Sequence, residues 1–158
     1  MSWPRRALLL APLALAACGF APVYGPGGTG SALQGRVGVA APADRVSYLL
    51  VRTLEERLGR AAAPAYDLSL ALETTQEALA IDPAGNTRRF NLLGRADYAL
   101  TDLATGDVVT SGRVENFTGY SATGTAVATL AAEQDAQARL MTILADAIVA
   151  RLTAASLP

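Results

Sequence analysis

The feature that most constrains the fold is a strict alternation of apolar and polar residues over positions 66–72. The apolar members of this run are Tyr66, Leu68, Leu70 and Leu72. Because successive side chains of a strand point to opposite faces, a period of two predicts a strand with one buried face. Such a strand needs neighbours in a sheet and a second layer over its apolar face.

Three further segments are typical of strands. Residues 36–41 alternate weakly, and residues 88–102 and 107–120 flank Ala104-Thr105-Gly106, which suits a three-residue hairpin loop with Gly106 in the left-handed conformation. The apolar side of the second segment carries Phe90, Leu92, Tyr98 and Leu100. Residues 82–86 have the composition of a turn. We therefore expect an N-terminal strand and a meander of three antiparallel strands.

Two segments have the period of amphipathic helices. Asp44 is a suitable N-cap for a helix that ends near Leu58, with Gly59 after it, and a second helix is expected over about 125–152. The expected apolar stripes are Val46, Leu49, Leu50, Leu54 and Leu58 in the first, and Val127, Leu130, Leu140, Met141, Leu144, Ile148 and Leu152 in the second. Since each helix has one stripe to bury, both should cover one face of the sheet. The order β-α-β-β-β-α predicts an α+β fold, a two-layer sandwich with a mixed sheet of about four strands.

The first 17 residues have the organisation of an export signal. Arg5 and Arg6 precede the apolar run 7–15, which is too short to span a bilayer as a helix. The sequence Leu15-Ala16-Ala17-Cys18 resembles the bacterial lipobox, in which the cysteine sulfur receives a diacylglycerol and the new amino group an acyl chain. We therefore expect a signal peptide over 1–17 and lipidation of Cys18. The alternative is an ordinary signal peptide followed by a buried cysteine.

The segment after the cysteine is expected to tether a folded domain to the membrane. Four glycines lie between positions 25 and 30, so we expect a flexible tether over 18–35 and a single domain over 36–158. By resemblance to the sorting rules of bacteria with two membranes, Gly19 in place of an aspartate favours the outer membrane. The lipid, rather than a transmembrane helix, would hold the protein there.

The composition excludes several classes of function. The chain has no histidine and one cysteine, which excludes Ser-His and Cys-His catalysis, His-ligated metal sites and an internal disulfide framework. Without Arg5 and Arg6, 11 arginines face 14 acidic residues, which argues against nucleic-acid binding. We expect no catalysis, no metal and no cofactor beyond the covalent lipid on Cys18. One alternative is a tethered envelope enzyme using Glu73 and Glu77; another is a periplasmic lipoprotein that binds some other ligand.

The first residues of the expected mature chain carry a resemblance to a known family. The sequence CGFAPVYG, from Cys18 to Gly25, resembles the start of LptE-type lipoproteins, whose alphaproteobacterial members commonly begin C-G-F-x-P-L-Y-G; Val23 replaces the leucine. The expected order of elements over 36–152 also matches that family's fold. The resemblance implies an outer-membrane lipoprotein, on the periplasmic side, that plugs the LptD β-barrel and supports its assembly. It also implies contact with lipopolysaccharide during insertion into the outer leaflet.

Lipopolysaccharide displays phosphates and carboxylates, so exposed arginines are its candidate ligands. Arg88 and Arg89 at the shoulder of a hairpin are the better candidates, the alternative being a plain solvated turn. Arg95 and Arg113 are weaker ones. With a three-residue loop at 104–106, facing residues have numbers that add to 210, so Arg95 opposes Glu115 and Arg113 opposes Asp97. We expect these arginines to form ion pairs.

Four aromatic residues are candidate contacts with a partner protein. Phe20 and Tyr24 lie near the lipid anchor, where they would dock on a barrel wall or enter the membrane interface. Phe117 and Tyr120 lie near the end of the last strand. The alternative for these two, which we favour, is that they close the sheet edge against the long helix.

Overall fold

The computed structural model describes residues 23–25, 27–81, 87–122 and 124–155, so Cys18, Phe20 and the signal segment lie outside the described residues. The elements are α2 (Thr29–Leu33), β1 (Val37–Val39), α3 (Arg45–Leu58), β2 (Tyr66–Ile81), β3 (Thr87–Asp102), β4 (Val108–Ser121) and α4 (Ala126–Ala154). The sheet has the order β1-β2-β3-β4. β1 runs parallel to β2 and the other pairs are antiparallel, which confirms the predicted mixed sheet and α+β fold.

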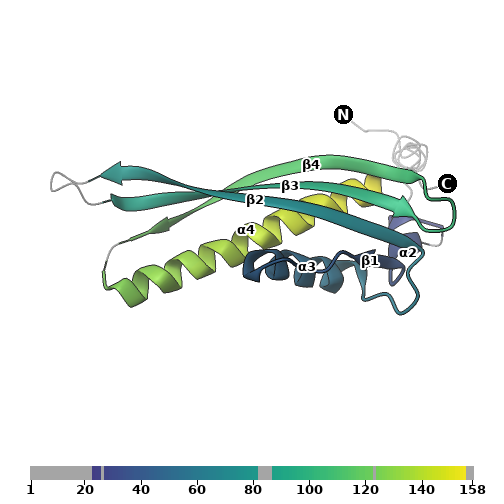
Figure 1. Ribbon diagram of the computed structural model, residues 1–158, viewed down its shortest axis with the longest axis horizontal. Coiled ribbons are helices and arrows are strands. Elements are labelled where there is room, and N and C mark those ends of the chain that lie inside the picture. The colour runs from purple at the N-terminus through teal and green to yellow at the C-terminus, as the bar shows by residue number, and fades with distance from the viewer. Residues whose placement is uncertain (1–22, 26, 82–86, 123, 156–158) are drawn as a thin grey trace, which may run out of the picture.

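The two long helices lie on one side of the twisted sheet, as predicted (Figure 1). We call this side the inner face and the opposite side the outer face. The core lies between the inner face and the helices, where Leu68 of β2 pairs with Leu100 of β3 and both are fully buried. Residues from α3 and α4 complete the same cluster, including Leu50, Leu54, Leu140, Leu144 and Ile148.

The α4 helix packs closely on the middle of the sheet at Gly94. A Cβ atom on Gly94 would lie 2.9 Å from Leu144 Cδ1 and 3.0 Å from Leu140 Cδ2, so only glycine allows this approach. The expected apolar stripe is wrong at its beginning, because Val127 is 77% exposed and Leu130 is 54% exposed. The first turns of α4 diverge from the strands (Figure 1), and the buried residues of the helix begin at Ala136.

The start of α3 is fixed by the predicted cap. The Asp44 side chain accepts from the Ser47 N–H at 2.7 Å, and the Asp44 N–H donates to Ser47 Oγ at 2.9 Å, which is a capping box. The hydrogen bonds that the Ser47 N–H and hydroxyl donate to the Asp44 carboxylate lower the pKa of this carboxyl. At the other end Gly59 has a φ of 75°, in the left-handed region that glycine tolerates.

The β3–β4 register is as predicted, although the turn is built differently. Arg95 faces Glu115 and Arg113 faces Asp97. Instead of a three-residue loop, four residues separate the paired Asp102 and Asp107. The register of the two strands then shifts by one residue between Thr101 and Leu100. The extra loop residue and the shift compensate each other, so the sum of facing residue numbers is still 210.

Two structured segments reach beyond the ranges that the sequence patterns mark. Residues 29–33 of the expected tether form the short helix α2, and Leu33 is fully buried in the core, so the folded domain begins before residue 36. The first strand of the meander continues past Leu72 to Ile81. Residues 73–79 are exposed on both faces, which removes the alternation that marks residues 66–72.

Candidate functional site

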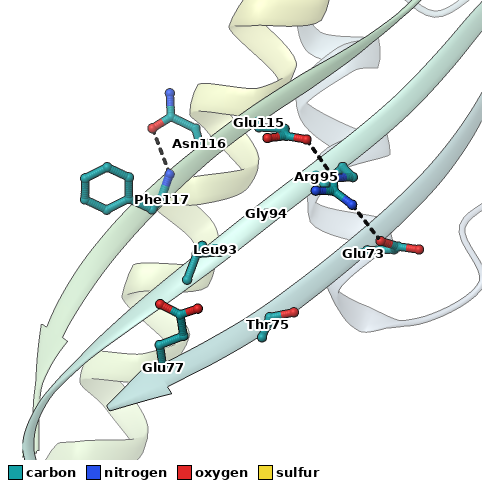
Figure 2. A pocket seen from close by; sticks show the side chains of 9 residues that line it. All are labelled: Glu73, Thr75, Glu77, Leu93, Gly94, Arg95, Glu115, Asn116 and Phe117. Carbon is teal, nitrogen blue, oxygen red and sulfur yellow. Dashed lines mark hydrogen bonds and ion pairs between the residues drawn. The ribbon is translucent and has the colours of Figure 1, made fainter. Parts of the chain in front are cut away.

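The outer face of the sheet carries a shallow hollow of about 370 Å³ over its centre (Figure 2). Its floor is a row of three residues that face each other across the strands, Thr75 of β2, Leu93 of β3 and Phe117 of β4. Phe117 is 61% exposed. The residues lining this outer-face hollow are Glu73, Thr75, Glu77, Leu93, Gly94, Arg95, Glu115, Asn116 and Phe117.

A ladder of charges bounds the hollow on one side. Arg95 lies between Glu115, at 2.7 Å from Nε to Oε1, and Glu73, at 3.8 Å from Nη1 to Oε2 (Figure 2). The predicted Arg95–Glu115 pair is therefore present, and Glu73 adds a second carboxylate to the same guanidinium. An arginine held by two carboxylates is a poor ligand for a further anion.

The next row holds the second predicted ion pair. Arg113 Nε donates to Asp97 Oδ1 at 2.7 Å, and Arg113 Nη2 donates to Asp97 Oδ2 at 3.2 Å, so the pair is bidentate. The hydrogen bond and charge of Arg113 hold the pKa of the Asp97 carboxyl below its usual value, and the same contact raises the pKa of Arg113. Both side chains are about half exposed, so the pair fixes orientation more than it stabilises the fold.

The outer-face hollow suits a ligand with an apolar group and a positive charge. Its apolar floor is flanked by Glu73, Glu77 and Glu115, against the single cation of Arg95. Glu73 and Glu77 both lie on this open surface, and the Glu73 side chain is 76% exposed. The hollow is open to solvent rather than enclosed.

Arg88 and Arg89 are both exposed at the start of β3. Arg89 faces Ser121 of β4, and the Arg88 carbonyl accepts from the Ala122 N–H at 3.0 Å. The β2–β3 register shifts at this end, between Ala78 and Ala80 and again between Ala80 and Ile81. The two arginines therefore place positive charge at an irregular end of the sheet.

The candidate aromatic contacts have different environments. Tyr120 is 6% exposed and stacks on Phe90 with ring centroids 5.3 Å apart, and burial raises the pKa of its hydroxyl. Tyr120 therefore lies on the inner face toward α4, the environment predicted for it. Phe117 points to the outer face instead, so it does not pack against the long helix. Tyr24 is 64% exposed, and its ring lies over Gly30 of α2, where a Cβ would come within 2.7 Å of Tyr24 Cε1.

Leu93 is a further member of this surface that was not among the candidate residues. The register that pairs Arg95 with Glu115 also places Leu93 opposite Phe117. The rule that facing residue numbers add to 210 was therefore sufficient to predict this pair. In the described ranges, no three Cys, Asp or Glu side chains gather closely enough to hold a metal ion. None of the helices in those ranges is long and apolar enough to cross a membrane.

The sequence matches the family model described as "LptE: Lipopolysaccharide-assembly" over residues 35–152. The chain belongs to the LptE family. The match spans the sheet and both long helices, which agrees with the family expected from the CGFAPVYG segment. The family assigns the chain to lipopolysaccharide assembly. Comparison with curated protein sequences gives no match.

Solved structures support the LptE assignment through the fold. A Caulobacter crescentus CB15 protein proposed to be a lipoprotein is 26% identical, with a TM-score of 0.67 over 82% of this chain and 96% of that one. Rare lipoprotein B from Shewanella oneidensis is 16% identical, with a TM-score of 0.57 over 74% and 91%. A minor lipoprotein from Acinetobacter baumannii is 15% identical, with a TM-score of 0.56 over 78% and 95%. The last two show similarity of fold alone.

Proposed function

We propose that this LptE-family chain is an outer-membrane lipoprotein, anchored on the periplasmic side through lipidated Cys18 and bound to the β-barrel LptD. In this role it plugs the barrel, supports its assembly and contacts lipopolysaccharide during insertion into the outer leaflet. The observation that carries the proposal is the family match over residues 35–152, which includes nearly the whole described domain. The chemistry required is binding rather than catalysis.

The arrangement of the surface supports a role in protein contacts. Phe117 lies exposed in the outer-face hollow, and Tyr24 lies exposed against α2 near the expected lipid anchor. Exposed aromatic residues are frequent centres of binding energy in interfaces. The proposed contacts with the barrel are therefore Phe117, Tyr24 and Phe20, whereas Tyr120 is buried.

Copurification from the native host tests the proposal. A tagged full-length chain, produced at native level and extracted in detergent, should bring a large β-barrel with it in equal amount. Mass spectrometry of the same sample should find a diacylglycerol on Cys18. A Cys18→Ala variant should lack the lipid anchor, and its signal peptide should no longer be cleaved before residue 18. A chain recovered without a barrel, or with unmodified Cys18 in the medium, contradicts the proposal.

The proposed lipopolysaccharide contacts are Arg88 and Arg89, which are exposed at one end of the sheet. The double variant Arg88→Ala with Arg89→Ala should weaken lipopolysaccharide binding by about tenfold, since a charge-assisted contact contributes roughly 1.5–3 kcal/mol. Binding is measured on the full-length chain in detergent at low salt. The matched control is Arg52→Ala with Arg151→Ala, which removes the same charge from exposed helix positions. Equal binding by the two double variants rejects the assignment.

A further inference from the structure

The β2 strand has a long edge without a neighbour. β1 pairs with β2 only over Tyr66, Asp67 and Leu68, and the last bond runs from the Ala40 N–H to the Leu68 carbonyl at 3.0 Å. The chain then turns away toward α3, while β2 continues to Ile81 (Figure 1). We call the stretch of β2 from residue 70 to residue 77 the open edge.

The backbone groups at the open edge follow from the β1 pairing. The Tyr66 N–H donates to the Arg36 carbonyl at 3.1 Å, so the even-numbered residues of β2 direct their N–H and C=O groups toward β1. Since this direction alternates along a strand, the same side is faced by Leu70, Leu72, Thr74 and Gln76. In the described part of the chain, no residue beyond the β1 pairing forms a backbone hydrogen bond on this side of these four residues. A row of such groups is a template for a further strand.

The side chains beside the open edge differ on the two faces. On the inner face, half-buried Leu70 and Leu72 line a hollow with the loop 40–44 and with Leu50 and Val51 of α3. On the outer face Glu73 and Glu77 are exposed. A strand added here would meet an apolar surface with one set of alternate side chains and carboxylates with the other.

We propose that the open edge of β2 binds an extended segment of a partner protein in which apolar and basic residues alternate. The segment continues the sheet where β1 stops, through main-chain hydrogen bonds to Leu70, Leu72, Thr74 and Gln76. Its apolar side chains cover Leu70 and Leu72, and its lysines or arginines lie beside Glu73 and Glu77. The inference goes beyond the proposed function and does not depend on it.

The charges on the strand disfavour one symmetric pairing of two copies at this edge, the one centred on Thr75. A two-fold antiparallel pairing centred on Thr75 would place Glu73 of one copy opposite Glu77 of the other. Like charges directly opposite each other destabilise a strand pair. The same two carboxylates attract a basic segment, so the charges favour a different partner.

Peptide binding to the isotope-labelled full-length chain in detergent tests the proposal. The probe is a synthetic eight-residue peptide that alternates valine and lysine, and the control peptide alternates valine and glutamate. The lysine peptide should shift the amide signals of Leu70, Leu72, Thr74 and Gln76 and slow their hydrogen exchange. The glutamate peptide should bind at least tenfold more weakly.

Two variants locate the contact. Thr74→Pro removes one N–H that points to the open edge and leaves the β3 ladder intact, so it should weaken binding of the lysine peptide about tenfold. Thr74→Val keeps this N–H and should leave the binding unchanged. The double variant Glu73→Gln with Glu77→Gln keeps the backbone groups of the open edge but removes both charges. It should bind the lysine peptide more weakly, and this binding should depend less on salt concentration. A urea midpoint equal to that of the unsubstituted chain checks that each variant is folded.

Four results of the peptide-binding experiments overturn the inference. They are no binding of the lysine peptide, equal binding of both peptides, shifts confined to the outer-face hollow, and equal affinity of the folded Thr74→Pro variant. Concentration-dependent dimerisation that Thr74→Pro abolishes would assign the edge to a second copy instead, and would also overturn it. Copurification of the barrel is unaffected by any of these results, so failure here and failure of the proposed function are distinguishable.

Discussion

The two faces of the sheet are built by different interactions. On the inner face, apolar residues of β2, β3 and β4 are closed under α3 and α4, and Leu68, Ala96 and Leu100 have no exposed surface. On the outer face, the corresponding positions hold the Glu73–Arg95–Glu115 ladder and the exposed Phe117. The strands are shared, so each residue step along a strand changes from one environment to the other.

This difference separates stability from recognition. Burial of an apolar side chain contributes roughly 1.5–3 kcal/mol, whereas an exposed ion pair contributes about 0–1 kcal/mol. The inner face therefore fixes the fold, and the outer face can change its charges and apolar groups at little cost. We expect the surfaces that contact other proteins to be drawn from the outer face and the open edge.

The largest expected effect is the truncation of an inner-face leucine. Leu68→Ala should lower the free energy of unfolding by about 2–5 kcal/mol, because the side chain is fully buried against Leu100 and leaves a cavity. The outer-face counterpart Phe117→Ala should stay within about 0.5 kcal/mol of the unsubstituted chain. Urea unfolding followed by circular dichroism measures both. Similar losses in the two variants would break the distinction between the faces.

A smaller effect is expected where a methyl group is added instead of removed. Gly94→Ala should cost about 1–3 kcal/mol, because its Cβ would meet the buried ends of Leu144 and Leu140 at 2.9 and 3.0 Å. Gly119→Ala on the outer face places a Cβ 3.5 Å from Asn91 Oδ1, an ordinary contact, and should be neutral or stabilising by about 0.4–1 kcal/mol. The same urea series compares them. A stable Gly94→Ala variant would mean that α4 can move away from the sheet.

The sequence predicted those parts of the fold where periodicity and burial agree. Residues 66–72 alternate because one face is buried there, and Asp44 and Gly59 mark the helix ends by local chemistry that needs no tertiary contact. The ion pairs of Arg95 and Arg113 followed from counting residues around one turn. The count was right although the turn was not, because a longer loop and a register shift cancel.

The parts that sequence could not predict depend on contacts between distant residues. Residues 73–81 do not alternate, since no helix covers them, and only pairing with β3 holds them in a strand. Leu33 follows a glycine-rich segment that suggests a tether, yet it is buried in the core. Val127 and Leu130 are exposed because the first turns of α4 diverge from the sheet, and the helical period of the sequence carries no information about this divergence. The open edge of β2 likewise depends on where β1 ends.

The smallest expected effect is the pH dependence of the outer-face pair Asp97–Arg113. The folded-state pKa of Asp97 lies below its usual value of 3.8, because Arg113 donates hydrogen bonds to the ionised carboxylate. A carboxyl with a lowered pKa contributes stability above its unfolded-state value and loses it as the pH falls through the folded-state value. Asp97→Asn should therefore be slightly less stable than the unsubstituted chain at pH 7, and the difference should shrink as the pH falls below about 4. Urea midpoints of both chains between pH 7 and pH 3 measure this. A difference independent of pH, or one as large as that of Leu68→Ala, would show that the pair contributes to the fold as the inner face does.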